Sequence, residues 1–342
     1  MKVCAAIATH NRAQLLVGCV RSLLEQTHPV SDIVIADTAS SEDPAQALRE
    51  SGLTSSGRIH IGRLPGNFGD DYGVHGAIAL ALRLDWDWLF VLDDDNAAEP
   101  GALAALLASE QARARGTAML TSAVIRQDGN PQVNHCGDWE RGWRPLGPAD
   151  FTRPRRIGWT GYGGSLVRRG ALETAGLPDT KFAAYSGDLD WSLRVGRVGE
   201  LWLIPAARVR HFDNPSAGTY RRGLLGKLAM ARKPMQARDM WKYVYGFRGY
   251  VYLRKEGGEG LIGFAAYLAL QIARVLLFNP DKLERARLFL HFGLAGRRGE
   301  FRTTPPDQFI ALIGARGAAR RIAARAVQVP AEPQEGIELE RL

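Results

Sequence analysis

The first half of the chain alternates short apolar runs with longer amphipathic segments. Apolar runs bounded by polar or turn residues are typical of buried strands, and they occur at residues 3–8, 32–36, 58–61, 88–92, 163–168 and 201–204. Apolar positions at helical spacing predict helices over residues 12–26, 43–50, 71–84, 100–115 and 188–198. This alternation predicts an α/β fold, with a mostly parallel sheet flanked by helices.

Polar residues follow the predicted strands. In parallel sheets of this kind, ligands bind beyond the carboxyl ends of the strands. The residues placed there are Thr9, Asn11 and Arg12 after the first run, Asp37 at the end of the second, Asn67 and Gly69 after the third, and Asp93, Asp94 and Asp95 after the fourth. The sequence therefore predicts a ligand site at this edge.

The acidic triple is the strongest chemical signal. Three adjacent carboxylates repel one another unless a cation neutralises them. Asp93 and Asp95 alternate along the strand end, so both side chains point the same way. Carboxylate oxygens suit Mg²⁺ or Mn²⁺, and such an ion stabilises a diphosphate leaving group. The alternative is an exposed turn that caps the next helix.

The C-terminal third has a different character. Residues 221–254 are basic and aromatic, and the longest apolar stretch, 260–278, is interrupted by Gln271 and Arg274. That stretch fits a core helix, or a helix lying on a membrane surface, better than a spanning helix. Residues 282–325 carry ten basic against three acidic side chains, so we expect peripheral membrane contact, with a solvated basic helix as the alternative. The Glu-rich residues 331–342 predict a disordered tail.

The amino-acid composition narrows the possible classes of protein. The chain has 342 residues, 46% of them hydrophobic, with 44 Lys and Arg against 36 Asp and Glu, which excludes wholesale disorder. A net charge of +8 is compatible with anionic lipid, nucleic acid or a phosphorylated substrate, but no nucleic-acid-binding motif is present, so we expect no nucleic-acid partner. Three cysteines without a CxxC pair argue against a disulfide scaffold or structural zinc site. The few cysteines indicate a reducing compartment, and the first apolar run is too short for a signal peptide. We therefore expect a cytoplasmic protein, at the inner face of the membrane.

Seven motifs stand in one order along residues 3–215: AIATHNRAQLLVGCVRSLLEQT, DIVIADTAS, GNFGDDYGVHGAIALAL, LFVLDDDN, GYGGSLVRRGALETAGLPD, YSGDLDWSLRVGRVG and PAARVRH. Together they resemble the family 2 glycosyltransferases of GT-A fold, and within them the bacterial galactofuranosyl- and rhamnosyltransferases. The resemblance implies an inverting transferase domain over 1–215, which moves a sugar from a UDP- or dTDP-linked donor to a glycan or lipid-linked glycan of the cell envelope. Residues 216–330 would form a helical extension and 331–342 the tail.

The resemblance also implies residue roles. Thr9, Asn11 and Arg12 would cradle the nucleotide, Asp37 would bind the base, and Asn67 and Gly69 would border the diphosphate. Asp93 and Asp94 would contact the nucleotide sugar, while Asp93, Asp95 and His211 would hold Mn²⁺ or Mg²⁺. Trp159, Tyr162, Gly163, Gly164 and Trp191 would face the acceptor, with core packing as the alternative for the aromatic rings.

Asp188 matches the catalytic base, and Asp190 is the second choice. Inversion requires one carboxylate to take the proton of the attacking hydroxyl. Gly187 is a departure, because many relatives carry an acid there. The alternative for both aspartates is helix capping, and Asp190 is also four residues before Arg194, a spacing typical of a surface ion pair.

Two other functions are the alternatives. A sugar-nucleotide pyrophosphorylase needs a glycine-rich signature after the first strand, and AIATHNRA contains no glycine. A glycan-binding protein on an inactive transferase fold is disfavoured by the intact acidic triple, Asp188 and His211.

Overall fold

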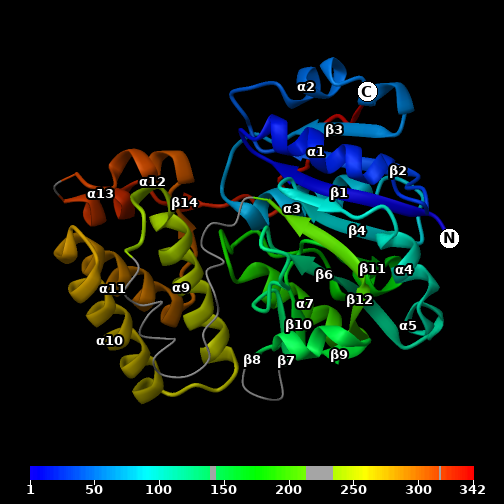
Figure 1. Ribbon diagram of the computed structural model, residues 1–342. Helices are drawn as coiled ribbons and strands as arrows, with labels where there is room; N and C mark the ends of the chain where they lie inside the picture. The colour runs from blue at the N-terminus through cyan, green and yellow to red at the C-terminus, as the bar shows by residue number, and fades with distance from the viewer. Residues whose placement is uncertain (139–143, 213–233, 316) are drawn as a thin grey trace.

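The computed structural model describes residues 1–138, 144–212, 234–315 and 317–342. An α/β body is built on one large sheet, and a group of helices from the C-terminal third lies against one side of it (Figure 1).

The large sheet has ten strands. Its order is β15-β3-β2-β1-β4-β11-β6-β12-β5, and β9 pairs with β12. The strands are β1 (Val3–Thr9), β2 (Asp32–Asp37), β3 (Ile59–Arg63), β4 (Trp88–Asp93), β5 (Asn96–Ala98), β6 (Thr117–Ile125), β9 (Arg155–Ile157), β11 (Ser165–Arg168), β12 (Glu200–His211) and β15 (Glu340–Arg341). The first four strands in sequence are parallel, and β11 runs antiparallel between β4 and β6. The predicted mostly parallel sheet is confirmed.

Helices cover both faces of this sheet. They are α1 (Ala13–Leu24), α2 (Pro44–Glu50), α3 (Asp70–Ala81), α4 (Ala102–Ala108), α5 (Glu110–Arg113), α6 (Arg169–Ala175) and α7 (Gly187–Val198). Along β1, Val3, Ala5 and Ile7 join the core under α1 and α4, whereas Cys4 and Ala6 join the core under α3 and α7. Both faces of the strand are buried, which is why its sequence is a continuous apolar run.

Smaller elements complete the α/β body. A three-stranded sheet is formed by β7 (Cys136–Asp138), β8 (Arg144–Pro145) and β10 (Trp159–Thr160). Short 3-10 turns lie at Leu53–Ser56 and Pro148–Thr152. The single helix predicted over 100–115 is instead two, because Ser109 is extended and its hydroxyl accepts a hydrogen bond from the Ala112 N–H at the start of α5.

The C-terminal third is helical. Its elements are a 3-10 turn at Ala237–Asp239, α9 (Met240–Glu256), α10 (Leu261–Phe278), α11 (Lys282–Arg298), α12 (Pro306–Leu312) and α13 (Ala318–Ala324), with a two-stranded ribbon of β13 (Arg302–Thr303) and β14 (Val327–Gln328). Its core is aromatic: Tyr245 and Phe247 of α9 pack against Phe292 and Phe289 of α11. The basic and aromatic segment that begins at Arg221 is described only from residue 234 onward, and this part packs internally through α9.

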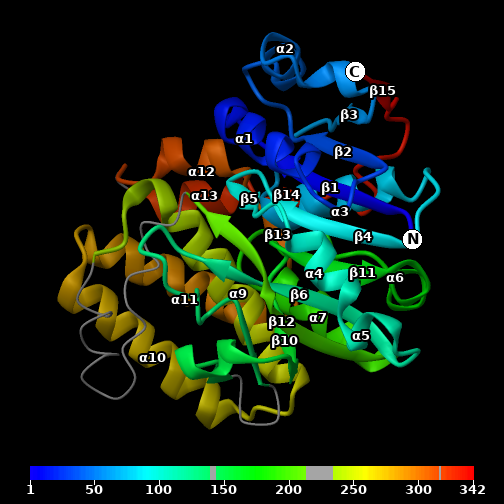
Figure 2. The same ribbon diagram turned by 45° about the vertical axis from the view of Figure 1, so that its right-hand side comes forward.

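The tail is ordered, which corrects the prediction for residues 331–342. Strand β15 pairs antiparallel with β3 at the edge of the sheet (Figure 2). Arg49 makes an ion pair with Glu340 at 2.6 Å, and Arg83 donates to the Ile337 carbonyl at 2.7 Å. An edge strand offers unpaired backbone groups, and Ile337 and Leu339 pack on the core beneath it. Charge composition alone did not reveal these contacts.

Candidate active site

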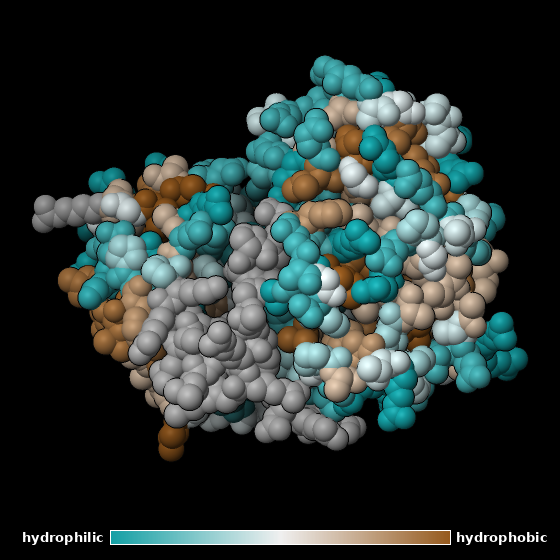
Figure 3. Space-filling view, in the orientation of Figure 1, coloured by the Kyte–Doolittle hydropathy of each residue, from teal (hydrophilic) through white to brown (hydrophobic). Residues whose placement is uncertain are grey.

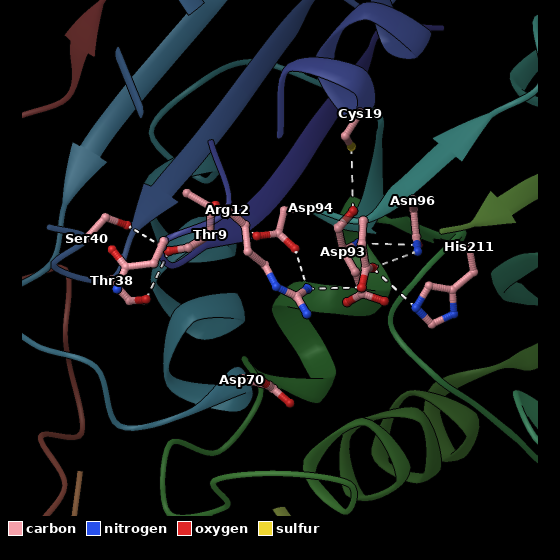
Figure 4. Close-up of polar contacts among 12 residues, drawn as sticks. Thr9, Arg12, Cys19, Thr38, Ser40, Asp70, Asp93, Asp94, Asn96 and His211 are labelled. Carbon is pink, nitrogen blue, oxygen red and sulfur yellow. Dashed lines mark hydrogen bonds and ion pairs between the residues drawn. The ribbon is translucent and has the colours of Figure 1, made fainter. Parts of the chain in front are cut away.

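Five of the predicted site residues lie together at the carboxyl edge of the sheet: Thr9, Arg12, Asp93, Asp94 and His211 (Figure 4). Register places Thr9 of β1 opposite Asp37 of β2, and Ala8 opposite Asp93 of β4. His211 reaches the same place because the end of β12 pairs with β5, directly opposite Asn96. The sheet thus joins residues that are far apart in the sequence.

Arg12 links two carboxylates of the acidic triple. Its Nη1 lies 3.0 Å from Asp94 Oδ1 and 3.0 Å from Asp95 Oδ2. Thr9 Oγ1 donates to Asp94 Oδ2 at 2.9 Å. Asp94 and Asp95 are both buried, so these contacts replace hydration that the carboxylates lost on folding. The alternative of an exposed turn is therefore wrong.

His211 approaches the cluster from the opposite side. Its Nε2 lies 3.3 Å from Asp95 Oδ1, and its Nδ1 lies 2.9 Å from Gln132 Oε1. Because both partner oxygens accept, Nδ1–H donates to Gln132 and Nε2–H donates to Asp95, and the contact with Asp95 raises the pKa of His211 although burial opposes it. Loss of the Nε2 proton would free that nitrogen for a metal ion, with Gln132 still holding the ring.

The three aspartates of the acidic triple carry more negative charge than Arg12 and His211 neutralise. Burial raises the pKa of Asp93 to about 7, and the charge of Asp95 adds to this shift. Burial raises the pKa of Asp94 to about 6, although Arg12 opposes it. Burial also acts on Asp95, but hydrogen bonds from His211 and Arg12 outweigh it and hold its pKa below the usual value. An added cation would relieve the remaining repulsion.

The predicted metal set is present only in part. Among the described residues, no group of three His, Cys, Asp or Glu side chains is close enough to hold a metal ion as it stands. Asp95 and His211 form a pair, and Asp93 lies beside Gly163, where an added Cβ would come within 2.7 Å of Asp93 Oδ2. Carboxylate oxygen and imidazole nitrogen fit the chemistry of Mn²⁺ or Mg²⁺, so ligation stays a proposal.

Asp37 borders a cavity at the carboxyl end of β2. Its Oδ2 accepts from Arg63 at 2.7 Å, and its Oδ1 accepts from the Ser40 N–H at 3.0 Å. The cavity measures about 610 Å³, and residues 338–341 of the tail form one of its walls. Asn11, in a left-handed conformation at φ 53°, accepts from the Ser41 N–H and so orders the neighbouring loop.

The loop before α3 depends on a glycine. Asn67 Oδ1 accepts from the Gly69 N–H at 3.0 Å. Gly69 has φ 106°, and an added Cβ would lie 2.1 Å from the Ala183 carbonyl oxygen. The next amide, of Asp70, donates to that same oxygen at 2.9 Å. Only glycine permits this close approach.

Lys242 is a site residue that sequence analysis missed. It projects from α9 to within 4.0 Å of Asp70, whose charge raises the pKa of Lys242. The basic and aromatic composition of residues 241–255 gave a signal for a cation, but not for its position.

Asp188 lies in the first turn of α7. Its Oδ1 accepts from the Leu189 N–H at 2.7 Å, while its Oδ2 faces Gly161, where an added Cβ would be 3.4 Å away. Burial raises the pKa of Asp188 to about 6. Asp190 instead pairs with Arg194 at 2.9 Å and borders a separate surface cavity of about 670 Å³. The structure thus favours the ion-pair alternative for Asp190.

A buried carboxyl group, that of Asp71, lies beside Gly187 and Asp188. Tyr162 Oη donates to Asp71 Oδ1 at 2.6 Å, and an added Cβ on Gly187 would come within 1.8 Å of that oxygen. Burial raises the pKa of Asp71 well above its usual value. Sequence analysis missed Asp71, because an aspartate in a first helical turn is ordinary.

Two of the aromatic rings predicted to face the acceptor are buried. Tyr162 and Trp191 are buried, 5.7 Å apart, and the Trp191 indole donates to the Gly176 carbonyl at 3.0 Å. Trp159 packs against the hydrophobic cluster of Phe182 and Leu189. These rings follow the core-packing alternative, since the sheet and α7 enclose them.

Gly163, Gly164 and His135 complete this side of the site. Gly163 borders Asp93, whereas Gly164, at φ +83°, lies against Ser122 in the sheet. His135, which sequence analysis missed, lies against Gly161, and burial lowers its pKa to about 4. A neutral imidazole therefore stands near Asp188 at physiological pH, since both residues border Gly161.

Comparison with known families decides the assignment. The pattern of glycosyl transferase family 2 matches residues 4–175. The chain belongs to glycosyl transferase family 2. The match covers the acidic triple, the nucleotide loop and Asp37, and it ends before Asp188, Asp190 and His211. The roles of these last three residues in the transferase are proposals.

The chain is similar to solved structures at low identity, and GalNAc-T7 shares its fold. GalNAc-T7, crystallised with UDP, GalNAc and Mn²⁺, is 18% identical with a TM-score of 0.50, over 73% of this chain and 50% of that one. TarS of S. aureus is 13% identical with a TM-score of 0.48, over 90% of this chain and 55% of that one. Residues 1–349 of TarS with UDP-GlcNAc are 11% identical with a TM-score of 0.45, over 87% and 73%. The chain thus spans about half the length of the first two, and no curated protein matches it.

Proposed function

We propose that this family 2 protein is an inverting, metal-dependent transferase that moves a sugar from a nucleoside diphosphate to a hydroxyl of a glycan or lipid-linked glycan. One observation carries the proposal: the acidic triple Asp93–Asp95, of which Asp94 and Asp95 are buried, meets Arg12 and His211 at the strand ends. Closely spaced carboxylates that lack enough positive charge around them suit a divalent cation bound to a diphosphate.

The donor's base fits the cavity at Asp37 and Arg63. Arg12, near Asp94 and Asp95, and Lys242, near Asp70, supply positive charge for the diphosphate. A uridine or thymidine diphosphate suits Asp37, because both bases present a ring N–H that a carboxylate accepts. The UDP and Mn²⁺ in the GalNAc-T7 crystal support the uridine form.

Asp95 and His211 would hold Mn²⁺ or Mg²⁺, with Asp93 as the neighbouring acid. When bound, the ion supplies positive charge that stabilises the diphosphate as it leaves. Arg12 would keep Asp94 and Asp95 ionised and oriented toward that position.

Asp188 would act as the base. Its Oδ1 is held by the Leu189 amide, which leaves Oδ2 to take the acceptor's proton beside Gly161. A pKa of about 6 keeps Asp188 ionised at neutral pH and basic enough to accept a proton. With the metal on the leaving group, the reaction requires no second acid.

The sequence motifs favour galactofuranose or rhamnose as the transferred sugar. An envelope glycan as acceptor, and a cytoplasmic location at the inner face of the membrane, belong to the same proposal.

A donor screen tests the function. Purified protein is incubated with UDP-galactofuranose, dTDP-rhamnose, UDP-glucose or UDP-GlcNAc, with and without Mn²⁺, and unfolding temperature is measured. We expect one donor to raise it in a metal-dependent way, because a ligand of the native state stabilises it, and to yield free nucleoside diphosphate with an acceptor glycan. Pyrophosphate release from a nucleoside triphosphate would instead identify a pyrophosphorylase, and the absence of any nucleotide binding would indicate an inactive fold.

A further inference from the structure

Helix α10 exposes an apolar half. A helix on the surface of a soluble protein normally turns polar side chains to water. Every exposed position of α10 is Leu, Ile or Ala, namely Leu261, Ile262, Ala265, Ala266, Ala269, Leu270, Ala273, Leu276 and Leu277. Ile262 is 88% exposed, and Leu261, Leu270 and Leu277 are each more than 60% exposed. At about 100° a residue, these positions cover roughly half of the helix circumference.

The polar residues of α10 lie on the other half. Gln271, Arg274 and Tyr267 are part-buried, and Tyr267 packs on Phe247 and Tyr250 of α9. Helix α10 is the one helix in the described part of the chain that is long and apolar enough to cross a membrane, yet only 17% of it is buried. Since only Phe264 and Val275 are buried, the core-helix prediction is wrong. Spanning would strip α10 from its partners and expose Arg274 to lipid.

Helix α11 continues the exposed face and adds charge. It lies beside α10, where Gly293 approaches Leu268. Its exposed leucines, Leu283, Leu290 and Leu294, fall at helical spacing on one stripe. The exposed cations Lys282, Arg287 and Arg298 lie on the same outer half of the helix. Arg287 and Arg298 pair there with Glu284 and Glu300, in exposed ion pairs that contribute little and can exchange for anionic headgroups. Hydrophobic atoms gather over α10 and α11 at the outer edge of the molecule, away from the large sheet (Figure 3).

We propose that the exposed residues of α10 and α11, the docking face, bind the surface of an anionic lipid bilayer with α10 lying in the interface. An apolar half-helix flanked by Lys and Arg is the pattern of interfacial helices, which bury the apolar side at the headgroup boundary while cations meet anionic lipids. The surrounding segment 282–325 carries ten basic against three acidic residues. A second copy of the chain would oppose this face with charge of the same sign. The docking face does not rest on the proposed function.

Vesicle flotation with the full chain tests the docking face. The probes are vesicles of phosphatidylcholine alone, and of phosphatidylcholine mixed with phosphatidylglycerol. We expect binding to the mixed vesicles that weakens in high salt. The triple variant Ile262→Gln, Leu270→Gln, Leu277→Gln should bind at least on the order of tenfold more weakly, because it loses the deepest apolar contacts. Arg287→Gln with Arg298→Gln should remove the preference for the anionic lipid.

A matched control replaces exposed apolar residues outside the docking face by glutamine. Val198→Gln with Val327→Gln alters two exposed apolar residues outside α10 and α11 and should leave vesicle binding unchanged. Unfolding temperature and UDP binding of all variants report folding and the donor site separately. The proposal is overturned if the wild-type chain does not float, if the triple variant floats as well as the wild type, or if the triple variant only converts a dimer that ignores vesicles into a monomer.

Discussion

At the scale of single residues, the proposed role of Asp188 and its burial have opposite effects on its ionisation. As a base it must be ionised near neutral pH, yet burial favours its neutral form and raises its pKa to about 6. A raised native pKa means that the protonated residue stabilises the folded chain at low pH, and that this stability is lost as the pH rises through 6. The catalytic role is therefore expected to reduce stability at neutral pH.

Replacing Asp188 by Asn separates these demands. Asp188→Asn should lower transfer by on the order of 10³-fold and keep UDP binding, because the donor contacts lie elsewhere. It should raise the free energy of unfolding by about 1–3 kcal/mol at pH 8, with the gain vanishing below about pH 4. In the wild-type chain, transfer should fall as the pH drops through 6. Equal turnover in wild type and Asp188→Asn would exclude Asp188 as the base.

A substitution at Gly69 tests the packing of the loop before α3. Gly69→Ala adds a Cβ that would lie 2.1 Å from the Ala183 carbonyl, so the loop must shift. Gly129 also has positive φ, +79°, but no atom within 4 Å of an added Cβ. We expect Gly129→Ala to cost about 1 kcal/mol from backbone strain alone, and Gly69→Ala to cost more and weaken UDP binding. Equal effects in calorimetry and denaturation would show that the contact with Ala183 is unimportant.

The tail and the donor cavity are linked at the scale of elements. Strand β15 covers the edge of β3, and residues 338–341 line the cavity at Asp37. Deleting residues 334–342 should uncover that edge and open the cavity. We expect UDP affinity to fall several-fold, with metal dependence preserved because the acidic triple is untouched.

Titration calorimetry with UDP measures this effect. Arg49→Gln, which removes only the exposed ion pair with Glu340, is the matched control and should change affinity little. If the deletion leaves UDP affinity unchanged, the tail has no part in donor binding.

Periodicity predicted the elements that are buried on one or two faces. The strands at 3–8, 32–36 and 88–92 and the helix at 12–26 follow directly from apolar spacing. Periodicity failed where a single contact decides the structure. Ser109 divides a predicted helix by capping α5, and the tail is fixed by an edge strand that is distant in the sequence. Such contacts depend on the assembled sheet.

The part of the site that is formed by the ends of neighbouring strands was predictable from the sequence. Thr9, Asp37 and Asp93–Asp95 follow strands, so a parallel sheet must bring them together. The pair of Asp71 and Tyr162 joins α3 to a loop, and no local pattern marks it. Tyr162 and Trp191 were assigned to the acceptor because aromatic rings stack on sugars, but burial places both in the core.

At the scale of the whole molecule, the α/β body carries the proposed donor site and the C-terminal helices carry the proposed docking face. Helix α9 connects the two, because it packs on α11 and also brings Lys242 close to Asp70. A transferase docked through α10 and α11 would work beside the bilayer, where a lipid-linked acceptor is concentrated. The proposed function and the docking face remain separately testable.

The central claim is that the acidic triple and His211 bind a divalent cation together with the donor's diphosphate. Titration calorimetry of UDP with and without Mn²⁺ tests it most directly, on the wild-type chain, Asp95→Ala and the control Asp32→Ala, whose aspartate pairs with His60 at the other end of β2. We predict that Mn²⁺ strengthens UDP binding at least about tenfold in the wild type and in Asp32→Ala, and has no effect in Asp95→Ala. UDP binding that is equally tight without metal, or a metal effect that persists in Asp95→Ala, would contradict the account.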